Sequence, residues 1–119
     1  MVKNESAENY LETILLLSKQ QPVVRSVDVA NELGYKKSSV SIAMKNLREK
    51  NHITVAESGH ISLTESGKQI AEMISERHEL LSNWLISLGV SPQTASEDAC
   101  KLEHVLSDES YDAIKKHVQ

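Results

Sequence analysis

Three side chains near the end of the sequence are of the types that bind transition metals, and their spacing would bring them together on a helix. Cys100, Glu103 and His104 stand at positions i, i+3 and i+4, which share one face of an α-helix. Thiolate, carboxylate and imidazole are ligands that proteins offer to divalent transition metals. The same spacing also fits a plain helix in which the cysteine is buried, the glutamate is solvated and the histidine packs or caps. The cluster alone is compatible with both.

Further candidate ligands lie elsewhere in the chain. Asn9 and Glu12 stand three residues apart and offer an amide and a carboxylate oxygen on one helix face, and His78 lies among polar neighbours in a long helical pattern. Each of these residues also fits an ordinary surface position. Their types indicate a possible contribution to a metal site, and the elements that carry them decide whether they meet.

Hydrophobic periodicity and turn residues predict a mostly helical chain. Ser6 and Ser38 are the expected N-caps of the first and third helices, and Gly34 is expected to stop the second. The predicted helices cover residues 6–20, 26–33, 38–50, 65–88, 92–106 and 108–118, and a two-stranded hairpin covers 53–55 and 61–63.

Two short helices joined through a glycine turn, followed by a hairpin, are typical of a winged helix-turn-helix. The second of these helices is basic and rich in hydroxyl groups, which suits contacts with phosphates and bases of double-stranded DNA. The two lysines before it also fit solvated turn residues. The candidate DNA-binding residues are Lys36, Lys37, Ser38, Ser39, Ser41, Lys45 and Arg48.

The charge distribution supports DNA binding by the N-terminal half of the chain. The whole chain carries 13 basic and 17 acidic residues, a net charge of −4. Residues 1–60 hold 8 basic and 7 acidic side chains, a net of +1, whereas residues 61–119 hold 5 and 10, a net of −5. The N-terminal half is therefore the half expected to meet nucleic acid.

Composition excludes several other classes of protein. No apolar run approaches the roughly 20 residues of a membrane-spanning helix, and the single cysteine cannot form an internal disulfide framework, which favours the cytoplasm. With no phenylalanine and 3% aromatic residues, an aromatic platform for single-stranded nucleic acid is not expected. No catalytic base and pocket are evident, so we do not expect an enzyme.

The helical pattern over 65–88 is too long for a wing and short helices to cover, so we expect the second half to form a dimer. The predicted fold is mostly α, with a winged helix-turn-helix DNA-binding domain at 1–64 and a helical dimerisation and metal-binding domain at 65–119.

An ordered series of motifs resembles the diphtheria toxin repressor family, including its manganese transport regulator branch. The resemblance covers nearly the whole chain. It is carried by the segments Glu8-Asn9-Tyr10-Leu11-Glu12-Thr13-Ile14, Asp28-Val-Ala30 to Ser39-Val40-Ser41, Leu63-Thr-Glu-Ser-Gly67, Arg77-His78 and Glu103-His104-Val-Leu-Ser107-Asp-Glu. It implies a homodimeric, metal-activated repressor of metal-uptake genes that binds palindromic operator DNA. Many members add a small third domain, so the resemblance implies either a short member or part of a longer one.

Carried over by position, the family's metal ligands fall on Asn9, Glu12, His78, Cys100, Glu103 and His104. Cys100 matches the iron-responsive branch, whereas Glu12 with His78 resembles the manganese branch. Asn9 departs from both, and Ser82 and Ser96 stand where iron-type members place ancillary ligands.

This mixed ligand set implies Fe(II) first and Mn(II) close behind, with Co(II), Ni(II) and Zn(II) as further ions that would bind in vitro. A second ion would lie between Glu12, His78 and a bridging Glu103.

The resemblance also implies how metal controls DNA binding. Two carboxylates, Glu12 and Glu103, repel each other without a cation, so metal would draw their helices together and set the two recognition helices of a dimer about 34 Å apart, one turn of DNA. Three alternatives stay open: a winged-helix regulator that no longer depends on metal, a metalloenzyme or metal-storage module, and a dimeric interaction module that does not bind DNA.

Overall fold

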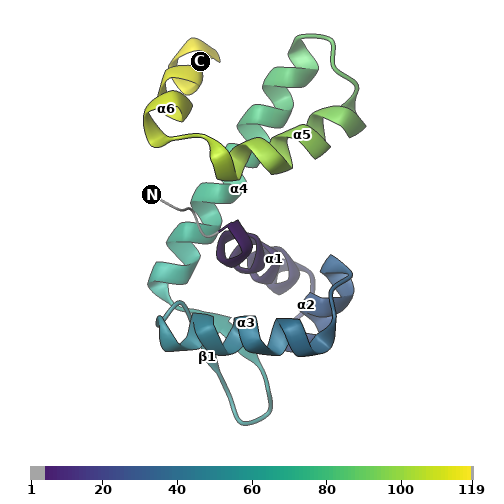
Figure 1. Ribbon diagram of the computed structural model, residues 1–119, viewed down its shortest axis with the longest axis vertical. Coiled ribbons are helices and arrows are strands. Elements are labelled where there is room, and N and C mark those ends of the chain that lie inside the picture. Colours follow the sequence, from purple (N-terminus) through teal and green to yellow (C-terminus); the bar gives the residue numbers. More distant parts are fainter. Residues whose placement is uncertain (1–4, 119) are drawn as a thin grey trace. The chain divides into compact units, whose positions relative to one another are not determined.

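The computed structural model describes residues 5–118 of the chain. In chain order its elements are α1 (Glu5–Gln20), α2 (Ser26–Leu33), α3 (Lys37–Glu49), β1 (Ile53–Val55), β2 (Ile61–Leu63), α4 (Glu65–Ser87), α5 (Pro92–Val105) and α6 (Asp108–Val118) (Figure 1). The predicted order of helices and hairpin is confirmed, with each predicted end within one residue of the observed end. No helix in the described part of the chain has the length and apolarity needed to cross a membrane.

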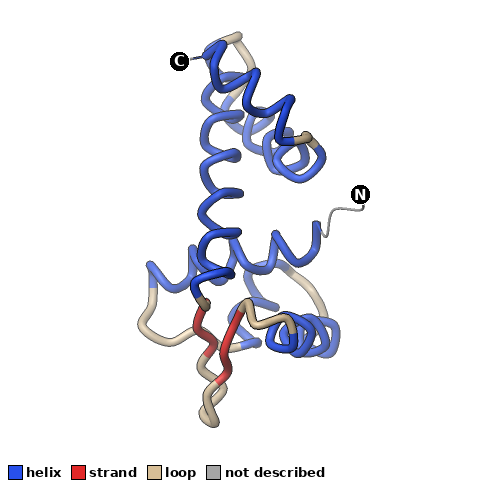
Figure 2. The backbone as a smooth tube through the Cα atoms, turned by 90° about the vertical axis from the view of Figure 1, so that its left-hand side faces the viewer, coloured by secondary structure: helices blue, strands red, loops and turns tan. Residues whose placement is uncertain are grey.

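The described residues divide into two compact units, one over residues 5–72 and one over residues 73–118. We call the first the N-terminal unit and the second the helical unit. The N-terminal unit contains α1 to α3, both strands and the first turns of α4, and the helical unit contains the rest of α4 with α5 and α6. The strands, red in Figure 2, all belong to the N-terminal unit.

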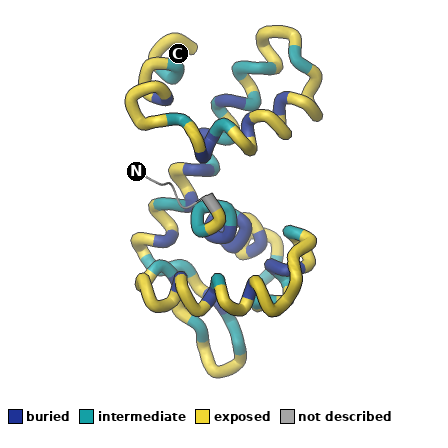
Figure 3. The backbone as a smooth tube through the Cα atoms, in the orientation of Figure 1, coloured by how far each residue is buried: buried dark blue, intermediate teal, exposed yellow. Residues whose placement is uncertain are grey.

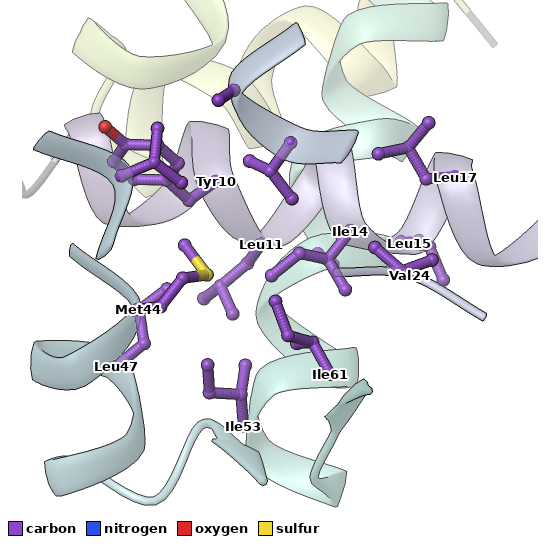
Figure 4. Close-up of a cluster of buried hydrophobic side chains, with 14 residues drawn as sticks. Tyr10, Leu11, Ile14, Leu15, Leu17, Val24, Met44, Leu47, Ile53 and Ile61 are labelled. Atoms are coloured by element: carbon purple, nitrogen blue, oxygen red, sulfur yellow. The ribbon is translucent and has the colours of Figure 1, made fainter. Parts of the chain in front are cut away.

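An aliphatic core holds the N-terminal unit together. Helix α1 packs against α2 and β2, and α3 packs against α2 and β1. The side chains at the centre of this core are Leu11, Ile14, Val24, Val29, Val40, Met44, Leu47, Ile53 and Ile61 (Figure 4). Because the buried positions of α3 all fall on one side of that helix, its other side faces solvent.

Two predicted helix caps are wrong. Helix α1 already includes Glu5, so Ser6 lies inside the helix, and α3 begins at Lys37, so Ser38 lies within its first turn. The N-cap of α3 is the extended residue Lys36, without a side-chain cap. Hydroxyl residues are common in first turns as well as at caps, so sequence alone places such a boundary only to within a residue or so.

Helix α2 ends as predicted. Gly34 adopts φ +70°, and the backbone N–H at that cap donates to the carbonyl of Ala30. A left-handed φ is easily adopted by glycine. At the other end of α2, the backbone N–H of Arg25 donates to the Asp28 carboxylate over 2.8 Å. Local hydrogen bonds therefore fix both ends of α2, and the left-handed φ of Gly34 starts the turn that leads into α3.

The hairpin is antiparallel, and a close approach fixes it to α4. Ile53 pairs with Leu63, and Val55 pairs with Ile61. A Cβ atom at Gly67 would lie 2.0 Å from the carbonyl oxygen of His52, so no larger residue fits there without a backbone shift. Glycine at this position lets the first turn of α4 press against the base of the hairpin.

The helical unit buries a different mixture of residues. Its interior combines a few apolar side chains with three polar ones, and buried positions of the chain are dark blue in Figure 3. These residues are Ile74, Arg77, Leu81, Ala95, Ala99, Glu103, His104 and Tyr111. Two of the candidate metal ligands, Glu103 and His104, are therefore among the buried polar residues of this unit.

Candidate functional site

A fully buried carboxylate lies at the centre of the candidate metal site. Glu103, on the last turns of α5, has 0% of its surface exposed. Its Oε2 lies 3.0 Å from Nδ1 of His78, and its Oε1 lies 3.3 Å from Nε2 of His104. An ionised carboxylate removed from water is costly unless charges or hydrogen bonds compensate it. The two imidazoles are placed to do this.

The three side chains come from two helices. Adjacent positions on α5 supply Glu103 and His104, while α4 supplies His78, whose side chain is 32% exposed. The sequence pattern predicts the pair on α5 from its spacing, and the structure adds the histidine from α4 to it. His78 is thus an inner residue with one side open to solvent, rather than an ordinary surface residue.

Arg77, which precedes His78, holds α4 against the turn between α5 and α6. Its guanidinium donates to the carbonyl of Leu106 over 3.1 Å and to the carboxylate of Asp108, and it lies 4.6 Å above the ring of Tyr111. Its buried Nε has no hydrogen-bond partner among the described residues. Arg77 therefore fixes the part of α4 that also carries His78 against this turn. Sequence analysis quoted this arginine only as part of a motif and assigned it no role.

Cys100 lies one turn before Glu103 on α5, and its side chain is exposed. The plain-helix alternative predicted the opposite burial, with the cysteine inside and the glutamate in water. That alternative is wrong for both residues. The thiol is accessible from solvent on the same helix as the buried carboxylate.

The donor atoms contact one another instead of surrounding a common point. Among residues 5–118, no group of three or more His, Cys, Asp or Glu side chains is arranged to hold a metal ion. Nδ1 of His78 lies within hydrogen-bond distance of one oxygen of Glu103, and Nε2 of His104 lies 3.3 Å from the other. The donor set still fits a divalent transition metal, because it combines imidazole, carboxylate and a nearby thiol around a buried negative charge.

Asn9 and Glu12 lie in the N-terminal unit. Both side chains are half-buried on α1, and the backbone carbonyl of Asn9 accepts a hydrogen bond from Thr13 Oγ1 over 2.8 Å. Ser82, on α4, is half-buried, and Ser96, on α5, is exposed. The role of Asn9 and Glu12 as ligands stays a prediction.

The predicted DNA-binding residues share the solvent side of α3. All seven are exposed, while Val40, Met44 and Leu47 anchor the opposite side of the helix in the core. The seven residues are Lys36, Lys37, Ser38, Ser39, Ser41, Lys45 and Arg48. Cationic and hydroxyl side chains of this kind contact phosphates and base edges when a helix enters the major groove.

One residue on this side of α3 escaped the sequence analysis. Ile42 is an aliphatic residue, yet 64% of its surface is exposed, and the other exposed residues of the helix are polar. Its position four residues after Ser38 and three before Lys45 places it on the same side. The signal was present in the sequence, because helical spacing puts residue 42 opposite the buried residues.

The wing is tied to the start of α2. Arg25 Nε donates to the carbonyl of Ser58 at the hairpin tip over 3.1 Å, and the backbone N–H of Ile61 donates to the carbonyl of Val24 over 2.8 Å. Gly59, next to the tip, has φ +89°. The wing is therefore held to the segment before the helix-turn-helix at two points.

A hollow of about 640 Å³ lies on the helical unit between α4 and α6. Leu80, Trp84 and Leu88 supply much of its apolar lining, and Val118 closes it from α6. Leu88 is 64% exposed. This unit therefore presents a concave, partly apolar surface to solvent.

Resolved pKa shifts lie beside the candidate site rather than in it. Burial raises the pKa of the Tyr111 phenol, and the Glu76 carboxylate raises it further. The hydrogen bond from Lys115 to Glu76, 2.6 Å long, raises the pKa of Lys115. These shifts keep the tyrosine neutral and the lysine charged to higher pH than usual.

Two family models match the chain, one on either side of the end of the hairpin. Residues 4–61 match the model described as "Iron dependent repressor, N-terminal DNA binding domain". Residues 64–119 match "Iron dependent repressor, metal binding and dimerisation domain".

Two curated relatives match almost the whole chain. The "Transcriptional regulator MntR" of Escherichia coli is 33% identical over 117 residues, which are 98% of this chain and 76% of the relative. An uncharacterized HTH-type transcriptional regulator of Methanocaldococcus jannaschii is 36% identical over 114 residues, covering 94% of this chain and 91% of the relative.

Solved structures show the same architecture. A manganese-dependent transcriptional repressor in complex with manganese is 28% identical, with a TM-score of 0.85 over 93% of this chain. The metal-dependent transcriptional regulator MtsR is 26% identical, with a TM-score of 0.87 over 94% of this chain. This chain spans about half the length of each, 51% and 53% respectively.

Proposed function

This chain belongs to the diphtheria toxin repressor and manganese transport regulator family of iron-dependent repressors, and we propose that it represses metal-uptake genes as a metal-loaded homodimer bound to palindromic operator DNA. The family consists of transcriptional regulators, not enzymes. The chain carries the family's DNA-binding domain followed by its metal-binding and dimerisation domain. We propose the boundary between them at residues 64 and 65, and the cytoplasm as the site of action.

The observation that carries this proposal is the buried carboxylate of Glu103 between two imidazoles. Burying a carboxylate with no exposed surface costs free energy in a small helical unit, and dimerisation alone does not require a buried charge. A divalent cation held by the same side chains would add positive charge beside this carboxylate. His78, Cys100, Glu103 and His104 are the proposed ligands of the helical unit, and Asn9 and Glu12 are proposed from the family resemblance.

For the metal itself we propose Fe(II) or Mn(II). The thiol of Cys100 favours Fe(II), and also Co(II), Ni(II) and Zn(II) in vitro, because thiolates prefer softer ions than Mn(II). The solved repressor described as manganese-dependent supports Mn(II). Metal availability in the cell outweighs intrinsic affinity in the final choice.

The DNA-binding part of the proposal rests on α3. Its exposed lysines and serines would contact phosphates and base edges, while its buried side is fixed in the aliphatic core. A dimer would present two such helices to successive major grooves. We propose that the hollow between α4 and α6 receives a second copy of this chain, because it lies in the domain that the family uses for dimerisation.

An anaerobic Co(II) titration of the reduced protein, followed by absorption, tests the metal part of this function. We expect saturable binding with a sulfur-to-metal charge-transfer band, which Cys100→Ala abolishes and Glu103→Gln weakens. Glu97→Gln, an exposed carboxylate on the same helix, is the matched control and should bind as the wild type does. Bands without the sulfur component would favour Mn(II), and no saturable binding would overturn metal sensing.

A second function has its own observation in its favour. His78 and His104 place their ring nitrogens 3.0 and 3.3 Å from the oxygens of Glu103, and such pairing within the chain is also expected of a winged-helix regulator that no longer depends on metal. Fluorescence anisotropy with operator duplexes separates the two. Metal-dependent repression predicts that a chelator lowers DNA affinity by about a hundredfold or more, whereas the metal-independent regulator predicts no change.

A further inference from the structure

The recognition helix carries one exposed aliphatic side chain that the fold does not use. Ile42 keeps 64% of its surface in solvent, and the core contacts of α3 are made by Val40, Met44 and Leu47. Isoleucine is also a weaker helix former than alanine, lysine or glutamine. Neither packing nor helix propensity therefore explains an isoleucine at this position.

Its surroundings distinguish it from scattered apolar residues on other surfaces. Helical geometry places Ile42 next to Ser38 and Ser39 one turn before it and next to Lys45 one turn after it, all of them exposed. The positive charge of Lys45 complements a phosphate backbone, and the hydroxyls can donate to phosphates or bases. The only acidic residue of α3 is Glu49, at its last position.

We propose that Ile42 contacts the 5-methyl group of one thymine in the major groove of each operator half-site and thereby selects thymine at that position. The inference rests on the proposed DNA-binding function and names how that function distinguishes bases. The thymine methyl is the one apolar group that base pairs present in the major groove. An aliphatic side chain at the middle of a polar recognition surface complements that group and no hydrogen-bonding edge.

The first step of the test identifies the DNA. The metal-loaded protein selects duplexes from a random pool, and the enriched half-site gives the thymines to be tested. Each thymine is then replaced by uracil, which lacks only the methyl group, and affinity is measured by fluorescence anisotropy at constant salt. The same series is measured with Ile42→Ala, with Ile42→Val, and with Leu16→Ala as a control at an exposed leucine outside α3.

For the wild type we expect one thymine per half-site at which uracil lowers affinity about fourfold, or about 16-fold with both half-sites replaced, the effect of burying one methyl-sized group. With Ile42→Ala the penalty at that thymine should fall below about twofold, since the alanine methyl does not reach the thymine methyl. Ile42→Val should retain most of the penalty, and Leu16→Ala should retain all of it.

Three results would overturn the inference. The first is an equal uracil penalty in wild type and Ile42→Ala at every thymine, which would leave the proposed function intact. The second is a change in dimerisation of Ile42→Ala during sedimentation without DNA, which would assign the side chain to a protein contact. The third is no sequence-selective duplex binding under any metal condition, which would overturn the proposed function together with this inference.

Discussion

The N-terminal unit and the helical unit are stabilised by different kinds of buried side chain. The first buries a continuous aliphatic cluster, in which Thr13 is the one buried polar residue among those described. The second buries an arginine, a glutamate and a histidine among a smaller number of apolar residues. Apolar burial stabilises a fold without any ligand, whereas buried charges depend on their partners.

This difference suits the N-terminal unit to binding DNA and the helical unit to responding to a cation or a second chain. A rigid aliphatic core presents α3 in one fixed geometry, as base recognition requires. A polar interior has a stability that changes with the charges around it, so a cation or a second chain can shift its conformation. The contrast leads to four predictions, beginning with the one expected to have the largest effect.

The first prediction concerns the aliphatic core. Ile14 is 1% exposed at the centre of the N-terminal unit, and Ile14→Ala should lower the free energy of unfolding by about 4 kcal/mol, because it removes buried methyl groups and leaves a cavity. Chemical denaturation measures this loss.

A matched substitution at the surface sharpens that result. Leu16, on the same helix, is exposed, and Leu16→Ala should change stability by less than about 0.5 kcal/mol. Equal losses for the two variants would contradict the view that the N-terminal unit depends on its aliphatic core.

The second prediction concerns the polar interior. Glu103→Gln keeps the shape of the side chain but removes its charge, so it should weaken Co(II) binding by about a hundredfold, or about 2.7 kcal/mol. Isothermal titration under anaerobic conditions measures the affinity. The rise in melting temperature that a given metal concentration produces should be smaller than in the wild type as well.

The contrary outcome is equally specific. If Glu103→Gln binds Co(II) as tightly as the wild type and Glu97→Gln does, the buried carboxylate serves only to pair with His78 and His104. The helical unit would then resemble the N-terminal unit in needing no ligand, and the contrast between the two would be one of composition alone.

The fold could be predicted from sequence because it rests on local signals. Helical spacing, Gly34 and the alternation around the hairpin were sufficient to place every element. The caps at Ser6 and Ser38 could not be placed, since a hydroxyl residue fits the first turn as well as the cap.

The site was predictable only within one helix. The spacing of Cys100, Glu103 and His104 put them on one side of α5, but which of them is buried depends on α4 and α6, which sequence spacing does not describe. The role of Arg77 likewise depends on its contacts with Leu106, Asp108 and Tyr111, which lie about 30 residues later in the chain. Long-range partners of this kind are set by tertiary packing and leave no local pattern.

The third prediction tests that long-range anchor. Arg77→Met keeps the aliphatic stem but removes the donors to Leu106 and Asp108 and the stacking on Tyr111, so stability should fall by about 1 to 2 kcal/mol. Most of the loss should come from the buried contacts, because the Asp108 side chain is 85% exposed.

The lysine at the other end of α6 provides the control. Lys115→Met removes an ion pair with Glu76 that lies at the surface, and it should change thermal stability less than Arg77→Met does. Thermal unfolding of both variants, followed by circular dichroism, checks the order. A larger effect at Lys115 would mean that surface charge, rather than the buried arginine, holds the three helices together.

The fourth and smallest effect is expected at Tyr111. Its buried hydroxyl has no hydrogen-bond partner among the described residues, so Tyr111→Phe should change stability at neutral pH by less than about 0.5 kcal/mol. At alkaline pH the free energies of unfolding of the wild type and of Tyr111→Phe should differ. Burial raises the pKa of this phenol above its ordinary 10.0, and Glu76 raises it further.

The raised pKa fixes the sign of that pH dependence. Above about pH 10 the unfolded chain releases the phenolic proton while the folded chain keeps it, so the wild type loses stability as pH rises and Tyr111→Phe loses less. Lys115, whose pKa is also raised, contributes a loss of the same sign to both proteins, and the difference between their curves isolates the tyrosine. Tyr10 has a pKa raised by burial in the N-terminal unit, so Tyr10→Phe provides the matched measurement there. Identical pH curves for wild type and Tyr111→Phe would show that this phenol is solvated in the folded chain, and that the polar interior of the helical unit is open to water.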